Sequence, residues 1–311
     1  MPAVVEVEQL RKSYGQVERL HGLSFEVQAG EILGFLGVNG AGKTTTIEIL
    51  EGYRPRDGGR VSVLGTDPAK ATREWRNRIG LVLQECELDP VYTVRETLTM
   101  FARYFERPTD VVATIGAVGL LEKSDERIGR LSGGQKRRLD VALGLVGDPE
   151  VLFLDEPTTG LDPVARREMW SMIEGLRSAG KTIFLTTHYM DEAEHLADRI
   201  IILRAGLIAA QGTAEELNAT LGYHTEITFE SSPGFDVGRL RGVLGADVQL
   251  EGSVVRLKTN RVQDDLTALL EWAKGERVEL GKLQAIRPSL DDVFVKLAEE
   301  APASAEGSAR E

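Results

Sequence analysis

The sequence predicts an α/β fold, and three observations carry the prediction. First, four short apolar runs of strand length recur along the chain between segments with helical periodicity. They cover residues 32–36, 79–83, 151–154 and 182–186. Second, glycine-rich or polar residues follow each run directly, as they do where the strands of an open α/β sheet end at a ligand site. Third, the chain has 311 residues, of which 42% are hydrophobic, enough for one large domain with a buried core and a smaller second domain.

The charge balance and the cysteine count limit the possible partners and compartment. A net charge of −12 and a pI near 5.0 argue against a broadly basic surface, so we expect no nucleic acid partner. Cys86 is the single cysteine of the sequence, and residues 1–8 lack the basic and then apolar profile of a signal peptide. We therefore expect the protein in the reducing cytosol. No apolar run approaches the length of a membrane span, so a role at a membrane requires another protein as anchor.

The first part of the chain indicates an antiparallel β-layer ahead of the first buried strand. Residues 4–10 and 23–27 alternate between apolar and polar side chains, and residues 28–30 form a turn. Tyr14 lies on a turn between these strands, where its ring could stack on a purine. A surface or packing role is the alternative for this tyrosine.

The segment on which the functional prediction depends is residues 37–44, Gly-Val-Asn-Gly-Ala-Gly-Lys-Thr, between a strand and a helix-like segment. In such an arrangement, backbone N–H groups turn inward around an anion, and the helix N-terminus favours negative charge. Lys43 can reach the outer phosphates of a nucleotide, and Thr44 can ligate magnesium. A chance glycine-rich turn is the alternative. The loop alone does not tell what the nucleotide drives, because kinases, GTPases and transport motors share it.

A helical subdomain is expected between the second and third buried strands. Residues 93–105 and 111–121 have helical periodicity, and a charged segment with a proline separates them. A second glycine-rich turn follows, in which Ser132 is suited to cap a helix while Gly133 and Gly134 expose backbone donors. By itself, such a turn before a helix is usually only a cap.

Polar side chains stand at the ends of three predicted strands. Gln84 follows the second strand, Asp155 and Glu156 follow the third, and Thr187 and His188 follow the fourth. Because these strand ends share one edge of an open sheet, we expect the side chains to converge on one phosphate site. A carboxylate there can hold magnesium, and its neighbour can orient or activate the attacking water; burying either without such compensation is costly. A solvated glutamine and a structural histidine are the alternatives for Gln84 and His188.

The C-terminal part indicates a separate small α+β domain. Residues 199–204 and 206–211 are expected to close the first domain as a hairpin, and from Gly222 onward the chain has no phosphate loop or metal-ligand cluster. The tail is rich in Ala, Ser, Glu and Gly and cannot bury enough surface to become ordered. We expect a nucleotide-binding domain at residues 1–220, with its helical subdomain at about 90–147. A C-terminal α+β domain at residues 221–297 and a disordered tail at 298–311 should follow.

In order and spacing, these motifs resemble those of the ATP-binding cassette of ABC proteins, over about residues 4–220. The resemblance implies an ABC-type P-loop ATPase core with an antiparallel β-subdomain and a helical subdomain, and ATP and Mg²⁺ as cofactors. It implies ATP contacts from Tyr14, Gly37, Asn39, Gly40, Gly42, Lys43, Thr44 and Thr45. It also implies Mg²⁺ ligands at Thr44, Gln84 and Asp155, and catalytic roles for Glu156, His188 and Gln84.

The same resemblance implies a dimer. Leu131, Ser132, Gly133, Gly134 and Gln135 resemble the ABC signature, which in this family caps the γ-phosphate of ATP held by a partner subunit. Asp162 resembles the D-loop aspartate, although a role as helix N-cap alone would explain it. One chain then cannot complete a site, and two cassettes have to sandwich two ATP molecules head to tail. A homodimer is the simplest expectation, and a heterodimer with a paralogue is the alternative.

Two further stretches, residues 187–194 and 288–294, are similar to nucleotide-binding subunits of ABC-2-type exporters, the branch that includes bacterial antibiotic-resistance pumps. The similarity implies an ATPase that energises a separate membrane permease docked on the helical subdomain near Gln84. It implies a peripheral position on the cytoplasmic side of the cell membrane, a C-terminal domain that regulates or stabilises the dimer, and drug-like or lipidic cargo. The alternative is a soluble ABC ATPase that serves iron–sulfur assembly or nucleic acid.

Overall fold

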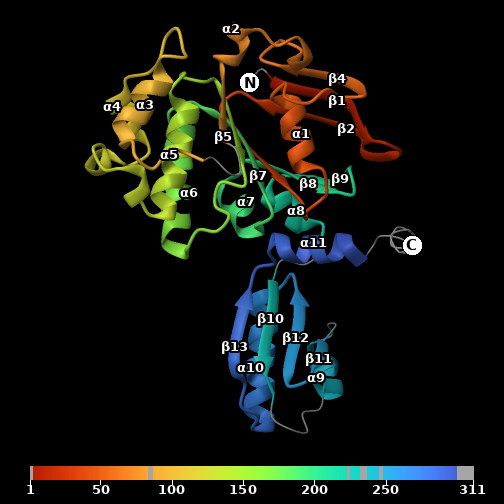
Figure 1. Cartoon of the computed structure of the whole chain (residues 1–311). Helices are drawn as coiled ribbons and strands as arrows, with labels where there is room; N and C mark the ends of the chain where they lie inside the picture. The colour runs from red at the N-terminus through yellow and green to blue at the C-terminus, as the bar shows by residue number, and fades with distance from the viewer. Residues whose placement is uncertain (1–2, 83–86, 223–224, 232–236, 245–247, 300–311) are drawn as a thin grey trace. The chain divides into compact units, whose positions relative to one another are not determined.

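The computed structural model describes residues 3–82, 87–222, 225–231, 237–244 and 248–299. The chain forms two compact units, Met1–Thr213 and Ala214–Glu311, and each is described by itself (Figure 1). The border precedes the expected one near residue 220, because α8 (Ala214–Ala219) packs on α11 (Leu290–Glu299) within the second unit. Gln84, Cys86 and the tail from residue 300 onward lie outside the described residues.

A six-stranded sheet forms the centre of the first unit. Its strands, in spatial order, are β5 (Ile79–Val82), β6 (Val151–Asp155), β7 (Thr182–Thr187), β3 (Ile32–Leu36), β8 (Arg199–Arg204) and β9 (Leu207–Gly212). All are parallel except β9, which pairs antiparallel with β8 as the expected hairpin. Every residue of β3, β6 and β7 is buried, because both faces of the sheet are covered. The four apolar runs are thus confirmed as strands of one sheet, with their carboxyl ends at one edge.

An antiparallel β-layer covers one face of this sheet. Its strands, in the order β2-β1-β4, are β1 (Ala3–Tyr14), β2 (Val17–Gln28) and β4 (Gly58–Val63). Phe25 of the layer packs against Phe35 and Phe184 of the central sheet, with ring centroids 5.5 and 6.1 Å apart. Helix α1 (Lys43–Leu50) joins the same core, and the short α2 (Arg73–Arg76) follows β4. Tyr14 is the last residue of β1 rather than part of a turn.

Helices cover the opposite face (Figure 1). They are α3 (Val94–Ala102), α4 (Val111–Ala117), α5 (Gly133–Leu145), α6 (Pro163–Ser178) and α7 (Met190–Leu196), with 3-10 turns at Leu121–Lys123 and Ile128–Arg130. A further 3-10 turn, Pro68–Lys70, contacts α1 and β4. Thr93 and Ser132 begin α3 and α5 through capping boxes, and Asp162 caps α6. The predicted helical subdomain is confirmed, as are the predicted caps at Ser132 and Asp162.

The second unit has the order βαββαβ before its terminal helix. The elements are β10 (Thr225–Glu230), α9 (Val237–Leu244), β11 (Val248–Glu251), β12 (Val254–Thr259), α10 (Val262–Glu276) and β13 (Gly281–Ile286). The strands form one antiparallel sheet in the order β11-β12-β10-β13, which is the ferredoxin-like arrangement. Its core draws on the strands and on α9 and α10, so the expected α+β domain is confirmed. Within the described ranges of the chain, no helix has both the length and the hydropathy of a membrane span.

Candidate functional site

The loop at residues 37–44 joins β3 to α1, as the sequence predicts. Gly42 precedes α1 with a φ of 113°, a left-handed conformation that glycine adopts without steric cost. A Cβ atom on Gly37 would lie 2.6 Å from the carbonyl oxygen of Leu203, and one on Gly42 would lie 2.6 Å from Leu20 Cδ2. Only glycine at these two positions lets the loop approach its neighbours so closely. The first N–H groups of a helix have no intrahelical partner, so this end of α1 suits an anion.

A cavity of about 630 Å³ opens beside the loop. Its lining residues are Tyr14, Arg19, Asn39, Gly40, Gly42, Lys43, Thr44, Thr45, Glu156, Thr159 and His188. All but Arg19 and Thr159 were predicted as site residues, so the structure brings predicted residues from four separate segments of the sequence into one cavity. Tyr14 is 40% exposed, with its hydroxyl 3.3 Å from Thr45 Oγ1 and the Arg54 guanidinium 5.2 Å from its ring centre.

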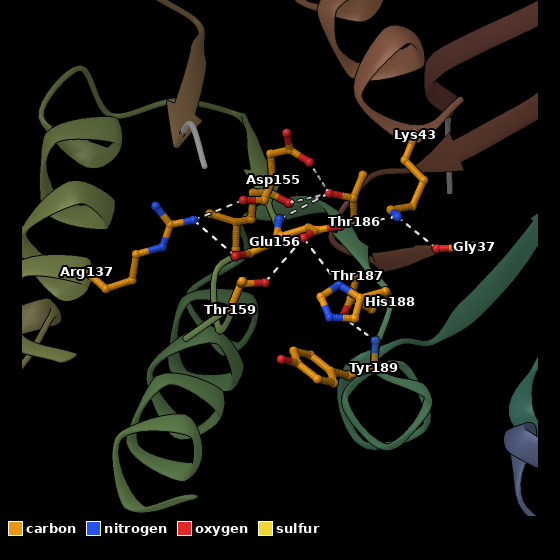
Figure 2. Close-up of polar contacts among 11 residues, drawn as sticks. Gly37, Lys43, Arg137, Asp155, Glu156, Thr159, Thr186, Thr187, His188 and Tyr189 are labelled. Atoms are coloured by element: carbon orange, nitrogen blue, oxygen red, sulfur yellow. Dashed lines mark hydrogen bonds and ion pairs between the residues drawn. The ribbon is translucent and has the colours of Figure 1, made fainter. Parts of the chain in front are cut away.

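Lys43, Glu156 and His188 form a line of polar contacts on the cavity wall (Figure 2). Lys43 Nζ donates to the carbonyl oxygen of Gly37 at 2.7 Å and lies 3.2 Å from Glu156 Oε1. His188 Nδ1 lies 3.2 Å from Glu156 Oε2. Burial raises the pKa of Glu156, but the Lys43 ammonium and the His188 ring outweigh burial, so this pKa lies below its ordinary value. Glu156 is therefore a carboxylate at neutral pH, held between a cation and an imidazole.

The backbone of Glu156 is strained. Its φ is 47°, in the left-handed region that non-glycine residues rarely adopt, at a cost of about 1–3 kcal/mol. Its N–H lies 3.1 Å from both the carbonyl oxygen and the hydroxyl of Thr186, and the Thr159 hydroxyl donates to its carboxylate at 3.2 Å (Figure 2). A strained backbone conformation persists only where several contacts with the surrounding structure hold it in place, and strained positions cluster at functional sites.

Arg137 is the residue that joins α5 to this strained segment. Its side chain is almost fully buried and donates to the carbonyl oxygens of Pro157, Asp155 and Glu156 at 3.0, 2.9 and 3.2 Å. Asp140 Oδ2 lies 3.7 Å from the same guanidinium. The backbone on both sides of Glu156 is thus fixed by a single cation from the helix that follows the glycine-rich turn.

Asp155 ends β6 in a buried position, and the Thr186 hydroxyl donates to its carboxylate. Burial raises the pKa of Asp155 above its ordinary value, with the Thr186 hydrogen bond opposing burial and the Glu156 charge adding to it. A carboxylate and a hydroxyl, as in Asp155 and Thr44, are the oxygen ligands that Mg²⁺ prefers. The described residues contain no group of three His, Cys, Asp or Glu side chains that could hold a metal ion. This donor set fits an ion that takes its other ligands from phosphate and water.

The signature segment lies apart from the cavity of its own chain. Leu131 is buried, whereas Ser132 and Gly133 are exposed at the N-terminus of α5, and no residue from 131 to 135 lines the cavity. Ser132 and Gln135 bond each other's backbone N–H in the capping box, at 3.3 and 2.9 Å. A Cβ atom on Gly134 would lie 2.8 Å from Ala165 Cβ, so this glycine allows α5 to approach α6.

Asp162 accepts hydrogen bonds from the N–H groups of Val164 and Ala165 at 2.8 and 3.0 Å, as the expected N-cap of α6. These bonds lower the pKa of Asp162. Gln84, expected near the metal and the attacking water, falls in the part of the chain that the structure does not describe.

Four residues of the site were missed by sequence reasoning: Arg137, Thr159, Thr186 and Arg19. Two left a trace in the sequence. Arg137 is a charged residue at a position of α5 that points into the core, and Thr186 is a polar residue in an apolar strand. A buried cation or hydroxyl in such a place needs a partner, and in both cases Asp155, at the end of β6, is a partner. Arg19 and Thr159 left no comparable trace.

Comparisons with known proteins agree with this geometry. The family described as ABC transporter matches residues 20–159, and the family described as ABC transporter domain-containing protein-like, C-terminal domain, matches residues 225–289. The chain is 39% identical over 305 residues to the Nod factor export ATP-binding protein I of Burkholderia lata, covering 95% of this chain and 97% of the relative. It is 39% identical over 304 residues to the daunorubicin resistance ATP-binding protein DrrA2 of Streptomyces coeruleorubidus, covering 94% of each.

Solved structures agree with the same assignment. The structure of cbiO1 from Clostridium perfringens, part of the ABC transporter complex cbiONQ, is similar with a TM-score of 0.64 at 28% identity, over 70% of this chain and 92% of that one. An ATP-binding subunit of an ABC transporter is similar with a TM-score of 0.62 at 25% identity, over 70% and 93%. The loop of residues 37–44, the strand ends and the relatives together lead to one conclusion. The chain belongs to the ABC transporter family, as an ATP-hydrolysing, ATP-binding protein of the ABC-2-type exporter branch.

Proposed function

We propose that this protein energises export through a separate ABC-2-type membrane permease by hydrolysing ATP. The observation that carries the proposal is the position of Glu156, between Lys43 and His188 on the wall of a cavity that the loop of residues 37–44 also lines. The relatives compared here are named for Nod factor export and daunorubicin resistance, and both extend through the C-terminal unit. No finding supports the alternative of a soluble ABC ATPase in iron–sulfur assembly or nucleic acid work.

The side chains divide the work of hydrolysis among them. The loop N–H groups and Lys43 bind the triphosphate, and Tyr14 stacks on the adenine. Asp155, Thr44 and Gln84 would hold Mg²⁺, which would offset charge on the phosphate oxygens. Glu156 accepts a proton from the attacking water, and His188 holds the carboxylate and the γ-phosphate in register. The phosphates compete with Glu156 for Lys43, so that ATP itself releases the carboxylate to act on water.

The proposed assembly is a head-to-tail homodimer, with a heterodimer as the alternative. The exposed signature end of α5 and the cavity lie apart within one chain, so Ser132 to Gln135 of a second cassette would close the site over the γ-phosphate.

The permease docks on the helical subdomain, which places the protein peripherally on the cytoplasmic side of the membrane. The cargo is drug-like or lipidic, in keeping with the names of the relatives. The second unit regulates or stabilises the dimer.

The substitution Glu156→Gln tests the chemistry. We expect ATP turnover to fall at least about 100-fold with ATP binding retained, and ATP to trap a dimer that is visible by size-exclusion chromatography. Glu122→Gln, at an exposed glutamate of the helical subdomain, is the matched control and should keep the wild-type rate. Undiminished hydrolysis by Glu156→Gln would remove the proposed role of this residue.

Transport is tested separately from the chemistry. The affinity-tagged protein is purified under mild conditions from detergent-solubilised membranes of its host. We expect a polytopic membrane protein to copurify in stoichiometric amount and to stimulate the ATPase after reconstitution in liposomes. Copurification of soluble proteins alone would contradict the transport function and leave the assignment of Glu156 intact.

A further inference from the structure

A buried carboxyl group lies on α7, the helix that follows His188 in the chain. Glu192 of α7 has no exposed surface, and the indole N–H of Trp170 on α6 donates to its Oε1 at 3.1 Å. Glu192 does not line the cavity of Lys43 and Glu156, so it touches neither the expected nucleotide nor the reacting atoms. A buried glutamate is costly unless it is neutral or fully hydrogen-bonded, and its retention here needs a reason.

Glu192 faces the end of β7 and the loop after β6. Thr187, the last residue of β7, and Thr158, in the loop after β6, both have their hydroxyls near its carboxyl group. The Thr187 hydroxyl also accepts a hydrogen bond from the N–H of Tyr189 at 3.0 Å, so its proton is available for the carboxyl group. Burial raises the pKa of Glu192, and the indole N–H of Trp170, the nearby hydroxyls of Thr187 and Thr158 and the charge of Arg166 only partly oppose it.

The contacts at this junction are incomplete. Among the described residues, buried side-chain atoms without a hydrogen-bond partner include Glu192 Oε2, Thr158 Oγ1 and Arg166 Nε, all from this one region. Thr158 and Glu192 thus stop short of a full hydrogen bond with each other. Unsatisfied buried polar atoms are rare, and a small displacement of the loop at residues 157–162 would complete this pair.

Helix α6 connects the junction to the signature segment. Ala165, in its first turn, is the close neighbour of Gly134. Arg166 lies over the Tyr189 ring at 4.3 Å, and the Tyr189 ring lies 4.1 Å from that of His188. One turn further, Trp170 bonds Glu192. Tyr189 and Glu192 therefore both contact α6, the helix that also packs against the N-terminal end of α5.

We propose that Glu192 is a positioning residue, whose carboxyl group ties the loop after β6 to the loop that carries His188 and thereby sets the His188–Glu156 contact. The inference rests on the proposed roles of Glu156 and His188 in hydrolysis. The carboxyl group accepts from the Trp170 indole, and the Thr187 and Thr158 hydroxyls lie near it, so a shift of the loop at residues 157–162 would change which of them it bonds. A change in the loop of residues 157–162 then alters where His188 stands relative to Glu156.

The decisive comparison is between Glu192→Met and Glu192→Gln. Methionine keeps the volume but removes every hydrogen bond, and we expect kcat for ATP to fall about 10- to 100-fold with KM changed less than about twofold. Glutamine keeps one acceptor and one donor, and we expect it to restore kcat to within about threefold of the wild type. Glu194→Met, on the exposed side of the same helix, is the matched control and should leave kcat unchanged.

A second readout follows the position of His188 without activity. The sequence has four histidines, so ¹³C-histidine ring signals can be assigned by single substitutions. We expect Glu192→Met, but not Glu192→Gln, to shift the His188 signals. Should His188→Ala keep the wild-type rate, the proposed catalytic role of His188 fails, while the ring signals still report whether Glu192 positions it.

Two smaller substitutions decide the outcome if Glu192→Met does not fold. Thr158→Val removes the hydroxyl near Glu192 with little change in volume, and Trp170→Phe removes the indole N–H while keeping an aromatic ring. Both should lower kcat at unchanged KM and shift the His188 signals. Wild-type kcat and unshifted signals in these two folded variants, or in Glu192→Met itself, would overturn the proposal.

Discussion

Replacing Arg137 by methionine should destabilise the first unit and slow hydrolysis together. The side chain supplies three hydrogen bonds to backbone carbonyl oxygens, at 3.0, 2.9 and 3.2 Å, in a site from which water is excluded. Methionine fills the space but leaves those carbonyl groups without these bonds, at about 1–3 kcal/mol each before relaxation. Burial already raises the pKa of Asp140 to about 6 in the presence of Arg137, so Asp140 can protonate rather than remain as an unpaired charge.

Partial relaxation of the three carbonyl groups makes their costs less than additive, so we expect a loss of about 3–5 kcal/mol in the free energy of unfolding.

The Arg137 substitution should also slow catalysis, through its effect on Glu156. Its φ of 47° costs about 1–3 kcal/mol, and Arg137 is one of the contacts that maintain it. Without Arg137 the backbone relaxes and the carboxylate moves, so kcat should fall about 100-fold, while ATP binding, which depends on Lys43 and the loop, should be retained.

Urea unfolding in a Trp272→Phe background measures the stability change. That background leaves Trp75 and Trp170, both in the first unit, as the fluorescent reporters. Arg130→Met is the control, because the Arg130 side chain is 76% exposed and its ion pair with Glu126 spans 3.6 Å; it should change stability by less than about 0.5 kcal/mol. An Arg137→Met variant with wild-type stability and wild-type kcat would refute the reasoning on both points.

Three further predictions concern the charge of Glu51, the base stack and the metal site. Burial, followed by the charges of Asp155 and Glu48, raises the pKa of Glu51 to about 8, so the folded chain binds a proton that the unfolded chain releases, and stability should fall as the pH rises from 4.5 toward 8. Glu51→Gln removes this loss, so its melting temperature should exceed that of the wild type at pH 8.5 and match it near pH 4; equal melting temperatures at both pH values would contradict the assigned pKa. Tyr14→Ala should weaken ATP binding about 5- to 100-fold in a fluorescent-nucleotide titration and Tyr14→Phe should not, because base stacking contributes about 1–3 kcal/mol. Asp155→Asn should make ATP affinity independent of Mg²⁺ in calorimetric titrations with and without chelator, and a retained Mg²⁺ dependence would exclude Asp155 as a ligand.

The fold could be predicted from the sequence wherever a local pattern allowed only one interpretation. An apolar run between glycine-rich turns is buried on both faces, and β3, β6 and β7 are strands for that reason. Ser132 and Asp162 were identified as caps because a short polar side chain before a helix has few other uses. Helix α4 stops at Ala117, four residues before its predicted end, since Gly119 turns the chain with a φ of +67°.

The site was predictable to the extent that its residues lie at strand ends or in the loop after β3. Lys43, Glu156 and His188 come from distant parts of the sequence, and the parallel strand order brings them together. Arg137 and Glu192 escaped because their roles depend on which backbone or side-chain atoms face them across helix packing. No local pattern encodes such a partner, which becomes visible only when α5, α6 and α7 are placed on the sheet.

The contact between Lys43 and Glu156 explains why the catalytic base would act only when nucleotide is present. Burial alone raises the pKa of Glu156, and the Lys43 ammonium is the chief group that reverses the shift. When the phosphates draw Lys43 away, that opposition is lost and their negative charge adds to the effect of burial. The carboxylate therefore becomes a stronger base at the moment the γ-phosphate arrives, and a weaker one when it leaves. His188 and the Thr159 hydroxyl, each 3.2 Å away, are then the groups left to hold the carboxylate, so the placement of His188 that we propose for Glu192 would bear on the rate.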